Sequence, residues 1–199
     1  MKQEEVELKA VIEDLINKLL EIINLKIIPE VLKKILKKNY DEGIEQAEVQ
    51  FGMNFFEDSE KLGFLEKYTF DNIKGMTDEI ADKLRKELSQ GLMNLESISQ
   101  LQKRVESVMD VGEERARMIA RTETNRAKNM GHLDGARQSG LDVVKRWDAH
   151  LDNRTSAVCK ALNGKEVPLD DKFVYEGQEF DAPPAHVNCR STLIFIQKD

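Results

Sequence analysis

"DAPPAHVNCRSTLIFI" occupies residues 181–196 and decides how the chain closes its fold. Two prolines, a histidine, an asparagine, a cysteine and an arginine stand directly before "RSTLIFIQ". That last run is rich in apolar and β-branched residues and predicts a closing strand over 190–197. The prolines favour an extended approach to it, because proline fixes its own φ and restricts the residue before it. This composition suits a metal site, a catalytic site or a structural clasp.

A second part of the candidate site lies upstream, where "TSAVCKAL" predicts a short helix that carries Cys159. His186 and Cys189 form an H-x-x-C, and thiolate and imidazole groups at such spacing suit tetrahedral zinc. A structural zinc site needs a fourth ligand, for which Asp152 and His150 are the candidates. The alternatives are a Cys159–Cys189 disulfide or close thiol pair, and plain packing of two small buried residues.

The rest of the sequence predicts an α+β fold that is mostly α. Long N-terminal helices precede a small C-terminal α/β unit with a short antiparallel sheet, to which "VVKRWDAHLD", "NGKEV" and "RSTLIFIQ" contribute strands. Helices are predicted over 4–26, from Pro29 to about Phe51, over 62–76, over 78–92 with Thr77 as N-cap, after a Ser97–Gln100 capping box, and over 113–138 with Gly140 as a stop.

Charge and arginine content change along the chain and predict two regions. The net charge is −7, yet only two of the arginines precede residue 111 and eight follow it. We therefore predict an acidic helical scaffold over 1–111 and an arginine-rich compact domain over 112–199. The overall charge argues against broad binding to duplex DNA. No run approaches the roughly 20 apolar residues of a membrane span, and the N-terminus lacks a signal-peptide pattern.

Basic residues repeat along one side of the helix predicted over 113–138. At about 100° per residue, Arg117, Arg121 and Lys128 fall on one stripe. Such a stripe is either a solvated helix face or a contact surface for acidic protein or nucleic-acid phosphate. The second interpretation makes the chain a DNA-binding module without sequence preference, or a partner-binding one.

The polar residues around the short helix are interpreted as residues that hold the fold. Glu123 projects from the apolar side of its helix, where an unpaired carboxylate is costly, so we expect a partner in Arg154 or Arg190. Asp152 is the second expected partner of these arginines. Trp147 is expected to pack over the small core, with an acceptor for its indole N–H.

Three segments together resemble the phage Mu F-like minor head protein family. They are "IARTETNRAKNMG" (119–131), "GLDVVKRWDAHLDNRTSAVCKALNGKEV" (140–167) and "PPAHVNCRSTL" (183–193). Their order and spacing carry the resemblance, which covers about residues 113–196. Family members commonly have a cysteine where this chain has Ser156 and another where it has Ser191, which removes two candidate zinc ligands.

The resemblance implies a structural virion component rather than an enzyme. Such proteins associate with the portal vertex and other capsid proteins, act in head assembly and DNA packaging or ejection, and lie in the head interior after assembly in the host cytoplasm. Viral DNA and further copies of the chain around the portal are the other implied partners, and no cofactor is implied. The enzymatic alternative is a metal-dependent nuclease or hydrolase that uses His150, His186 and Cys189, although the chain has no HExxH, P-loop or GxGxxG motif.

Overall fold

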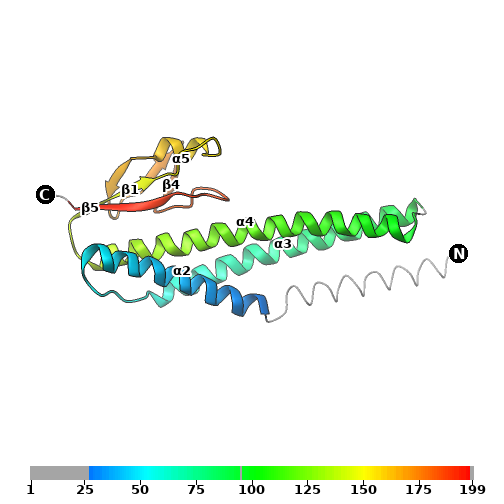
Figure 1. The fold of residues 1–199 in the computed structure, drawn as a ribbon, viewed down its shortest axis with the longest axis horizontal. Coiled ribbons are helices and arrows are strands. Elements are labelled where there is room, and N and C mark those ends of the chain that lie inside the picture. The colour runs from blue at the N-terminus through cyan, green and yellow to red at the C-terminus, as the bar shows by residue number, and fades with distance from the viewer. Residues whose placement is uncertain (1–26, 95, 198–199) are drawn as a thin grey trace. The chain divides into compact units, whose positions relative to one another are not determined.

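The computed structural model describes residues 27–94 and 96–197, which form an α+β fold dominated by helices (Figure 1). The helix predicted over 4–26 lies outside these residues. None of the described helices is long and apolar enough to cross a membrane. The described elements, in chain order, are α2 (Ile27–Phe51), α3 (Ser59–Met93), α4 (Ile98–Gln138), β1 (Val143–Asp148), α5 (Ala157–Leu162), β2 (Glu166–Pro168), β3 (Phe173–Tyr175), β4 (Gln178–Phe180) and β5 (Thr192–Gln197).

The long helices are more continuous than predicted. A break at Thr77 and a second break between residues 110 and 113 are both wrong, because α3 and α4 run through these positions. A residue type that favours the N-cap position can also lie inside a helix, and the backbone stays helical at both of these positions. The Ser97 capping box is confirmed, since the Ser97 N–H donates to Gln100 Oε1 at 2.8 Å just before α4 begins. Gly140, with φ of +65°, follows the end of α4 as predicted.

The described chain divides into two compact units, and the predicted domain boundary near residue 111 stays a prediction. One unit contains Thr69–Arg117 together with the start of α2 up to Val31, and the other combines Leu32–Tyr68 with the chain from Met118 onward. Residue 111 lies inside α4. Sequence composition could not reveal this, because most of α2 belongs with the C-terminal residues through contacts that are far apart in the chain.

The unit that contains Thr69–Arg117 has a small apolar core and a charged network. Leu84 of α3 and Val108 of α4 are both buried and belong to the same apolar cluster. Arg104 joins α4 to Glu87 at 2.5 Å and to Glu96 at 2.7 Å, so that one guanidinium ties two carboxylates.

The other unit is built on a close crossing of α2 and α4. A Cβ atom on Gly43 would overlap the carbonyl oxygen of Lys128, and one on Gly131 would overlap the carbonyl oxygen of Tyr40. Glycine is required at both positions because the two backbones touch. At the same crossing the buried Tyr40 hydroxyl donates to Asp134 Oδ2 at 2.6 Å. Gly43 is therefore a packing residue of this crossing.

A three-stranded antiparallel sheet in the order β2-β1-β5 completes this unit. Lys145 at the centre of β1 faces Val167 on one side and Phe195 on the other. The strands and the short helix predicted for the C-terminal region are confirmed. The hairpin of β3 and β4 was not predicted, although its turn residues Glu176 and Gly177, with φ of +48° and +79°, have the positive φ values that tight hairpins need.

Candidate functional site: a thiol and imidazole cluster

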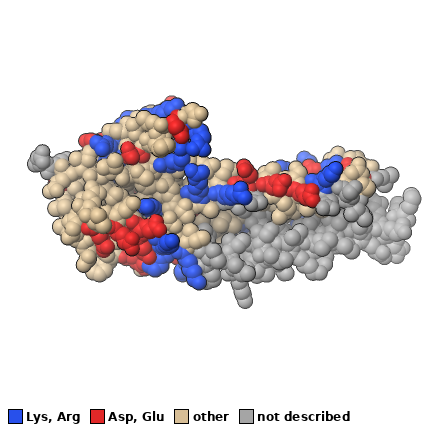
Figure 2. Space-filling view, in the orientation of Figure 1, with Lys and Arg blue, Asp and Glu red and all other residues tan. Residues whose placement is uncertain are grey.

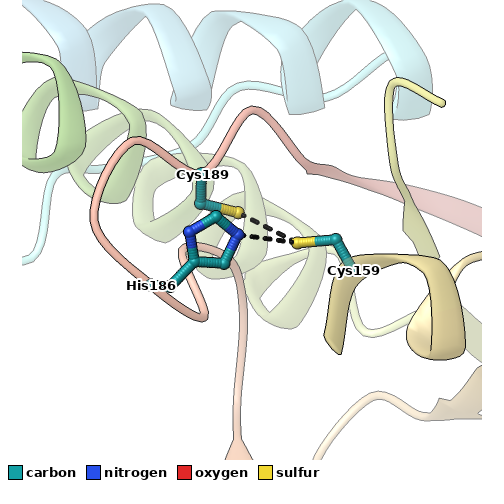
Figure 3. Close-up of side chains that lie close together, drawn as sticks. All are labelled: Cys159, His186 and Cys189. Carbon is teal, nitrogen blue, oxygen red and sulfur yellow. Dashed lines mark hydrogen bonds between the residues drawn. The ribbon is translucent and has the colours of Figure 1, made fainter. Parts of the chain in front are cut away.

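Cys159, His186 and Cys189, which we call the Cys–His cluster, converge between α5 and the loop that precedes β5 (Figure 3). The two Sγ atoms are 3.6 Å apart, and Cys159 Sγ lies 3.2 Å from His186 Nε2. Both cysteines are buried, and they are free thiols. The structure thus brings together the three residues that the sequence singled out for a clasp or a metal site.

Hydrogen bonds fix the orientation of the imidazole ring. His186 Nδ1 lies 2.7 Å from the carbonyl oxygen of Val187, which can only accept, so Nδ1 carries the proton. The lone pair of Nε2 therefore faces the Ser156 hydroxyl at 2.8 Å and the Cys159 thiol. Ser156 is also the N-cap of α5, where its Oγ accepts from the Cys159 N–H at 3.3 Å.

A tight turn places His186 and Cys189 on the same side of their loop. The Cys189 N–H donates to the His186 carbonyl at 3.2 Å, and Asn188 has φ of +62°, a conformation that asparagine adopts more readily than most residues. Two residues of α4 hold this turn. Thr122 Oγ1 accepts from the Asn188 N–H at 2.9 Å, and Asn125 Nδ2 donates to the Cys189 carbonyl at 3.2 Å.

Side-chain amides continue this attachment along β5, which lies beside the C-terminal half of α4 (Figure 1). Asn129 Oδ1 accepts from the Leu193 N–H at 3.0 Å, and Gln50 Nε2 of α2 donates to the Phe195 carbonyl at 2.7 Å. β5 is an edge strand of the described sheet, and these side chains form hydrogen bonds with backbone groups on its outer edge. They therefore protect that edge from pairing with another strand.

The α4 residues that perform this role were not predicted from the sequence. Thr122, Asn125 and Asn129 are spaced i, i+3 and i+7, so they share one face of α4. Three short polar residues on the buried side of an otherwise apolar stripe are the signal that could have identified them, since buried polar groups need partners.

Lys145 was missed as well, and it anchors the start of the 181–196 stretch. Its side chain is fully buried, and its Nζ donates to the Asp181 carbonyl at 2.8 Å and to the Asp181 carboxylate at 2.5 Å. Arg137 of α4 holds the same carboxylate at 3.1 Å. The stretch is therefore fixed at both ends, at Asp181 by ionic contacts and at β5 by amides.

Asp152 holds the fold and does not join the Cys–His cluster. Arg190 binds both of its carboxylate oxygens, at 2.6 and 2.8 Å, and these hydrogen bonds hold the pKa of the Asp152 carboxyl well below its usual range. Among the described residues, the group that could hold a metal consists of the two cysteines and His186 alone. Asp152 as a fourth metal ligand is thus wrong, because the guanidinium occupies its oxygens. His150 is exposed and lies outside this group, although it lines the same small cavity as His186.

The predicted partners of Glu123 are wrong. Its carboxylate is almost fully buried and accepts from Arg126 Nε at 2.9 Å, one turn further along α4. Arg190 is engaged with Asp152, and the Arg154 side chain is largely exposed at 3.7 Å from Asp152. A partner on the same helix was available at i+3, and it required no contact across the fold.

Trp147 lies in the core as predicted, but its expected acceptor is missing. The side chain is fully buried and packs edge-on against Phe173, with ring centroids 5.2 Å apart. Its Nε1 has no hydrogen-bond partner in the part of the chain that the structure describes. The area that the ring buries outweighs one unsatisfied donor at this position.

The three residues of the predicted basic stripe all belong to α4. Arg117 and Arg121 are exposed, while Lys128 is half-buried with its Nζ 3.8 Å from Glu42. On the face drawn in Figure 2, some Lys and Arg side chains lie next to Asp and Glu side chains. Contact of these residues with DNA or a partner stays a prediction.

The environment of Cys159 does not favour a nucleophile. Burial raises the pKa of the Cys159 thiol, so the protonated form predominates near neutral pH. A small cavity of about 20 Å³ opens beside the cluster and is lined by Ser156, His186 and Arg190, among others. The arrangement suits structural cross-linking or metal binding better than covalent catalysis.

Comparison with known proteins places the chain in a family. The model of the family described as "Phage Mu protein F like protein" matches residues 82–194, which include the whole Cys–His cluster. The chain belongs to this family. No solved structure matches this phage Mu F-like chain.

Two curated proteins are similar to this phage Mu F-like chain over part of their length. The minor head protein GP7 of Bacillus phage SPP1 is 33% identical over 129 residues, which cover 59% of this chain and 41% of GP7. The NAD(+)–arginine ADP-ribosyltransferase EFV of Enterococcus faecalis is 28% identical over 128 residues, which cover 60% of this chain and 26% of that enzyme. The chain thus aligns with less than half the length of either relative.

Proposed function

We propose that this phage Mu F-like chain is a structural component of a phage or phage-related head, located in the virion at the portal vertex. The carrying observation is the family match over residues 82–194. A relative named as a minor head protein, at 33% identity, supports the same role. The finer parts of the proposal are association with the portal and other capsid proteins, a ring of copies around it, and a contribution to DNA packaging or ejection.

The chemistry of the site supports a structural role over a catalytic one. Groups that a hydrolase would need near substrate are engaged in the fold: Asp152 binds Arg190, and His186 is hydrogen-bonded at both ring nitrogens. The thiol of Cys159 is buried and has a raised pKa. These contacts hold a small domain in one shape, which is what a component of an assembled shell requires.

Exposed apolar side chains supply surfaces for protein partners in the unit that contains the cluster. Val49 is 87% exposed, Phe56 81% and Phe64 66%. Large apolar groups in water are unfavourable unless a partner covers them, and such groups are enriched at interfaces. We therefore assign the portal or capsid contact to the surfaces of α2, the loop after it, and the start of α3.

Co-purification with portal protein tests the proposal. A tagged chain expressed with the portal and capsid proteins of its own genome should retain the portal protein, and Phe64→Glu should reduce retention without changing the melting temperature. Val174→Glu, at a 52% exposed hairpin position, is the matched control and should leave retention unchanged. Particles that assemble and infect normally without the chain would contradict the proposal.

Two activity assays test the enzymatic alternatives, which are ADP-ribosyl transfer and DNA cleavage. Purified chain should release no nicotinamide from NAD(+) and should not cleave plasmid DNA in the presence of divalent metals. Plasmid cleavage that His186→Ala abolishes would replace the structural role by a hydrolytic one. Binding to DNA that weakens steeply with salt and depends on Arg121 would add a nucleic-acid contact to the structural role.

A further inference from the structure

The spacing of the donor atoms in the Cys–His cluster matches a metal coordination shell. In a tetrahedral zinc site, bond lengths of about 2.3 Å to sulfur and 2.0–2.1 Å to nitrogen separate two sulfurs by about 3.8 Å and sulfur from nitrogen by about 3.6 Å. The observed separations are 3.6 Å for the two Sγ atoms and 3.2 Å for Cys159 Sγ and His186 Nε2, and all three donor atoms lie within 4.8 Å of one another. Fitting all three donors around one ion requires movements of no more than about 1 Å, since the largest separation is at most 4.8 Å against about 3.6 Å in a tetrahedral site.

The imidazole is oriented as a metal ligand requires. A ligating histidine donates its other ring N–H to a carbonyl or carboxylate, which fixes the tautomer and the ring plane. His186 Nδ1 makes this bond to the Val187 carbonyl at 2.7 Å, and the lone pair of Nε2 faces the Cys159 thiol and the Ser156 hydroxyl, which a bound ion would displace from it.

An oxygen can supply the fourth position. Ser156 Oγ lies 2.8 Å from His186 Nε2, on the side of the cluster where the cavity of about 20 Å³ opens. A cavity of that size holds one water molecule, for which a volume of roughly 10–15 Å³ suffices. A water bound there would accept or donate a hydrogen bond at the Ser156 hydroxyl.

The local charges are compatible with a divalent cation. Two thiolates balance the charge of one Zn²⁺, and the neutral imidazole adds none. Two guanidinium groups line the adjoining cavity: that of Arg190 binds Asp152 at 2.6 and 2.8 Å, and that of Arg154 lies 3.7 Å from the same carboxylate. The cation therefore does not face a guanidinium without a carboxylate partner.

From these observations we infer that Cys159, His186 and Cys189 bind one zinc ion in tetrahedral geometry. The fourth ligand is the oxygen of a water molecule that is hydrogen-bonded to the Ser156 hydroxyl. The ion joins α5 to the turn before β5, two segments that are 30 residues apart at the cysteines. It stabilises the domain, and the inference does not depend on the head role. Binding releases the thiol protons, so that affinity increases with pH.

Cobalt titration of the reduced full chain tests the inference, because Co²⁺ occupies zinc sites and reports thiolate ligands by charge-transfer absorption. We expect one Co²⁺ per chain, displaced by one Zn²⁺. Cys189→Ser and His186→Gln should each weaken Zn²⁺ binding at least about tenfold. The fluorescence of Trp147, the only tryptophan, shows whether each variant is folded.

A gain-of-affinity variant keeps the test decisive if the loss variants unfold. Ser156→Cys places a third thiolate at the fourth position and should tighten Zn²⁺ binding at least about tenfold. Ser139→Cys is the control, since it adds a thiol at the end of α4, outside the cluster, and should change nothing. Three results would overturn the inference: cobalt binding by the folded, reduced chain that never reaches one equivalent, an absence of charge-transfer absorption, or equal affinities for the two serine-to-cysteine variants.

Discussion

Replacing Gly131 by alanine should destabilise the unit that contains the Cys–His cluster. An ideal Cβ at this position overlaps the carbonyl oxygen of Tyr40 and lies 3.0 Å from its carbonyl carbon and 3.1 Å from the amide nitrogen of Ile44. All three atoms belong to the backbone of α2, which cannot rotate away as a side chain can. The two helices must therefore separate.

The expected loss follows from three opposing contributions. Overpacking a close contact costs about 1–3 kcal/mol. Separation of the helices also weakens the buried hydrogen bond from Tyr40 to the Asp134 carboxylate, which contributes about 1.5–3 kcal/mol. Alanine in place of glycine returns about 1 kcal/mol through helix propensity. The net destabilisation is about 2–4 kcal/mol within these ranges.

Urea unfolding followed by tryptophan fluorescence measures this change in the right unit, because Trp147 is the only tryptophan and lies in its core. With a slope of about 2 kcal/mol per molar urea, the midpoint should fall by about 1–2 M. Gly63→Ala is the matched control: it makes the same chemical change inside α3, where a Cβ would meet nothing within 4 Å. That variant should gain up to about 1 kcal/mol.

Opposite signs for the two variants are the essential result. If Gly131→Ala were neutral or stabilising, α2 and α4 would not cross at this glycine, and the assignment of α2 to the same unit as the cluster would fail. If both variants lost stability equally, the loss in Gly131→Ala could not be attributed to the helix crossing, because the control has no close contact at its glycine.

Three further predictions concern the attachment of β5 and the response to acid. Asn129→Ala leaves the Leu193 N–H without its acceptor and should cost about 1–3 kcal/mol in urea unfolding. Burial lowers the pKa of His132 to about 4, against about 6.5 in the unfolded chain, so between pH 6.5 and pH 4 the unfolded state binds a proton that the folded state does not. The free energy of unfolding should therefore fall by up to about 3 kcal/mol as the pH drops from 6.5 to 4, and His132→Gln should flatten this pH dependence. Hydrogen bonds from Arg190 lower the pKa of Asp152, so its contribution to stability is fully present above the unfolded-state pKa of about 4 and declines gradually as pH falls below that value; Asp152→Asn should lower the melting temperature at pH 7, and the difference from the unmodified chain should shrink progressively as the pH is lowered from 4.

Local patterns predicted most of the C-terminal fold. The strands around Trp147 and before the C-terminus, the short helix with Cys159, and the capping box at Ser97 are each encoded within a few residues. The hairpin of β3 and β4 escaped because each strand has only three residues, too few for an alternation to stand out. The helix breaks predicted inside α3 and α4 show the reverse problem, since a residue that can cap also tolerates a helix interior when packing continues the helix.

The members of the candidate site were predicted from the sequence, but the partners of the neighbouring carboxylates were not. Residue type singled out Cys159, His186 and Cys189, because few other roles need two thiols and an imidazole. Their ion-pair neighbours were assigned wrongly, since several arginines could reach each carboxylate and only geometry selects one. Glu123 took Arg126 on its own helix, and Asp152 took both donors of Arg190.

The sequence by itself determined the class of fold and the family, and it singled out the three members of the Cys–His cluster, because these depend on periodicity, order and chemical type along the chain. Only the tertiary structure decided that most of α2 packs with the C-terminal domain, that amides from α4 hold the turn before β5, and that Asp152 stays away from the thiols. The physical reason is that a backbone crossing or a bidentate hydrogen bond depends on atomic separations between residues far apart in the chain, and local propensity contains no information about those separations.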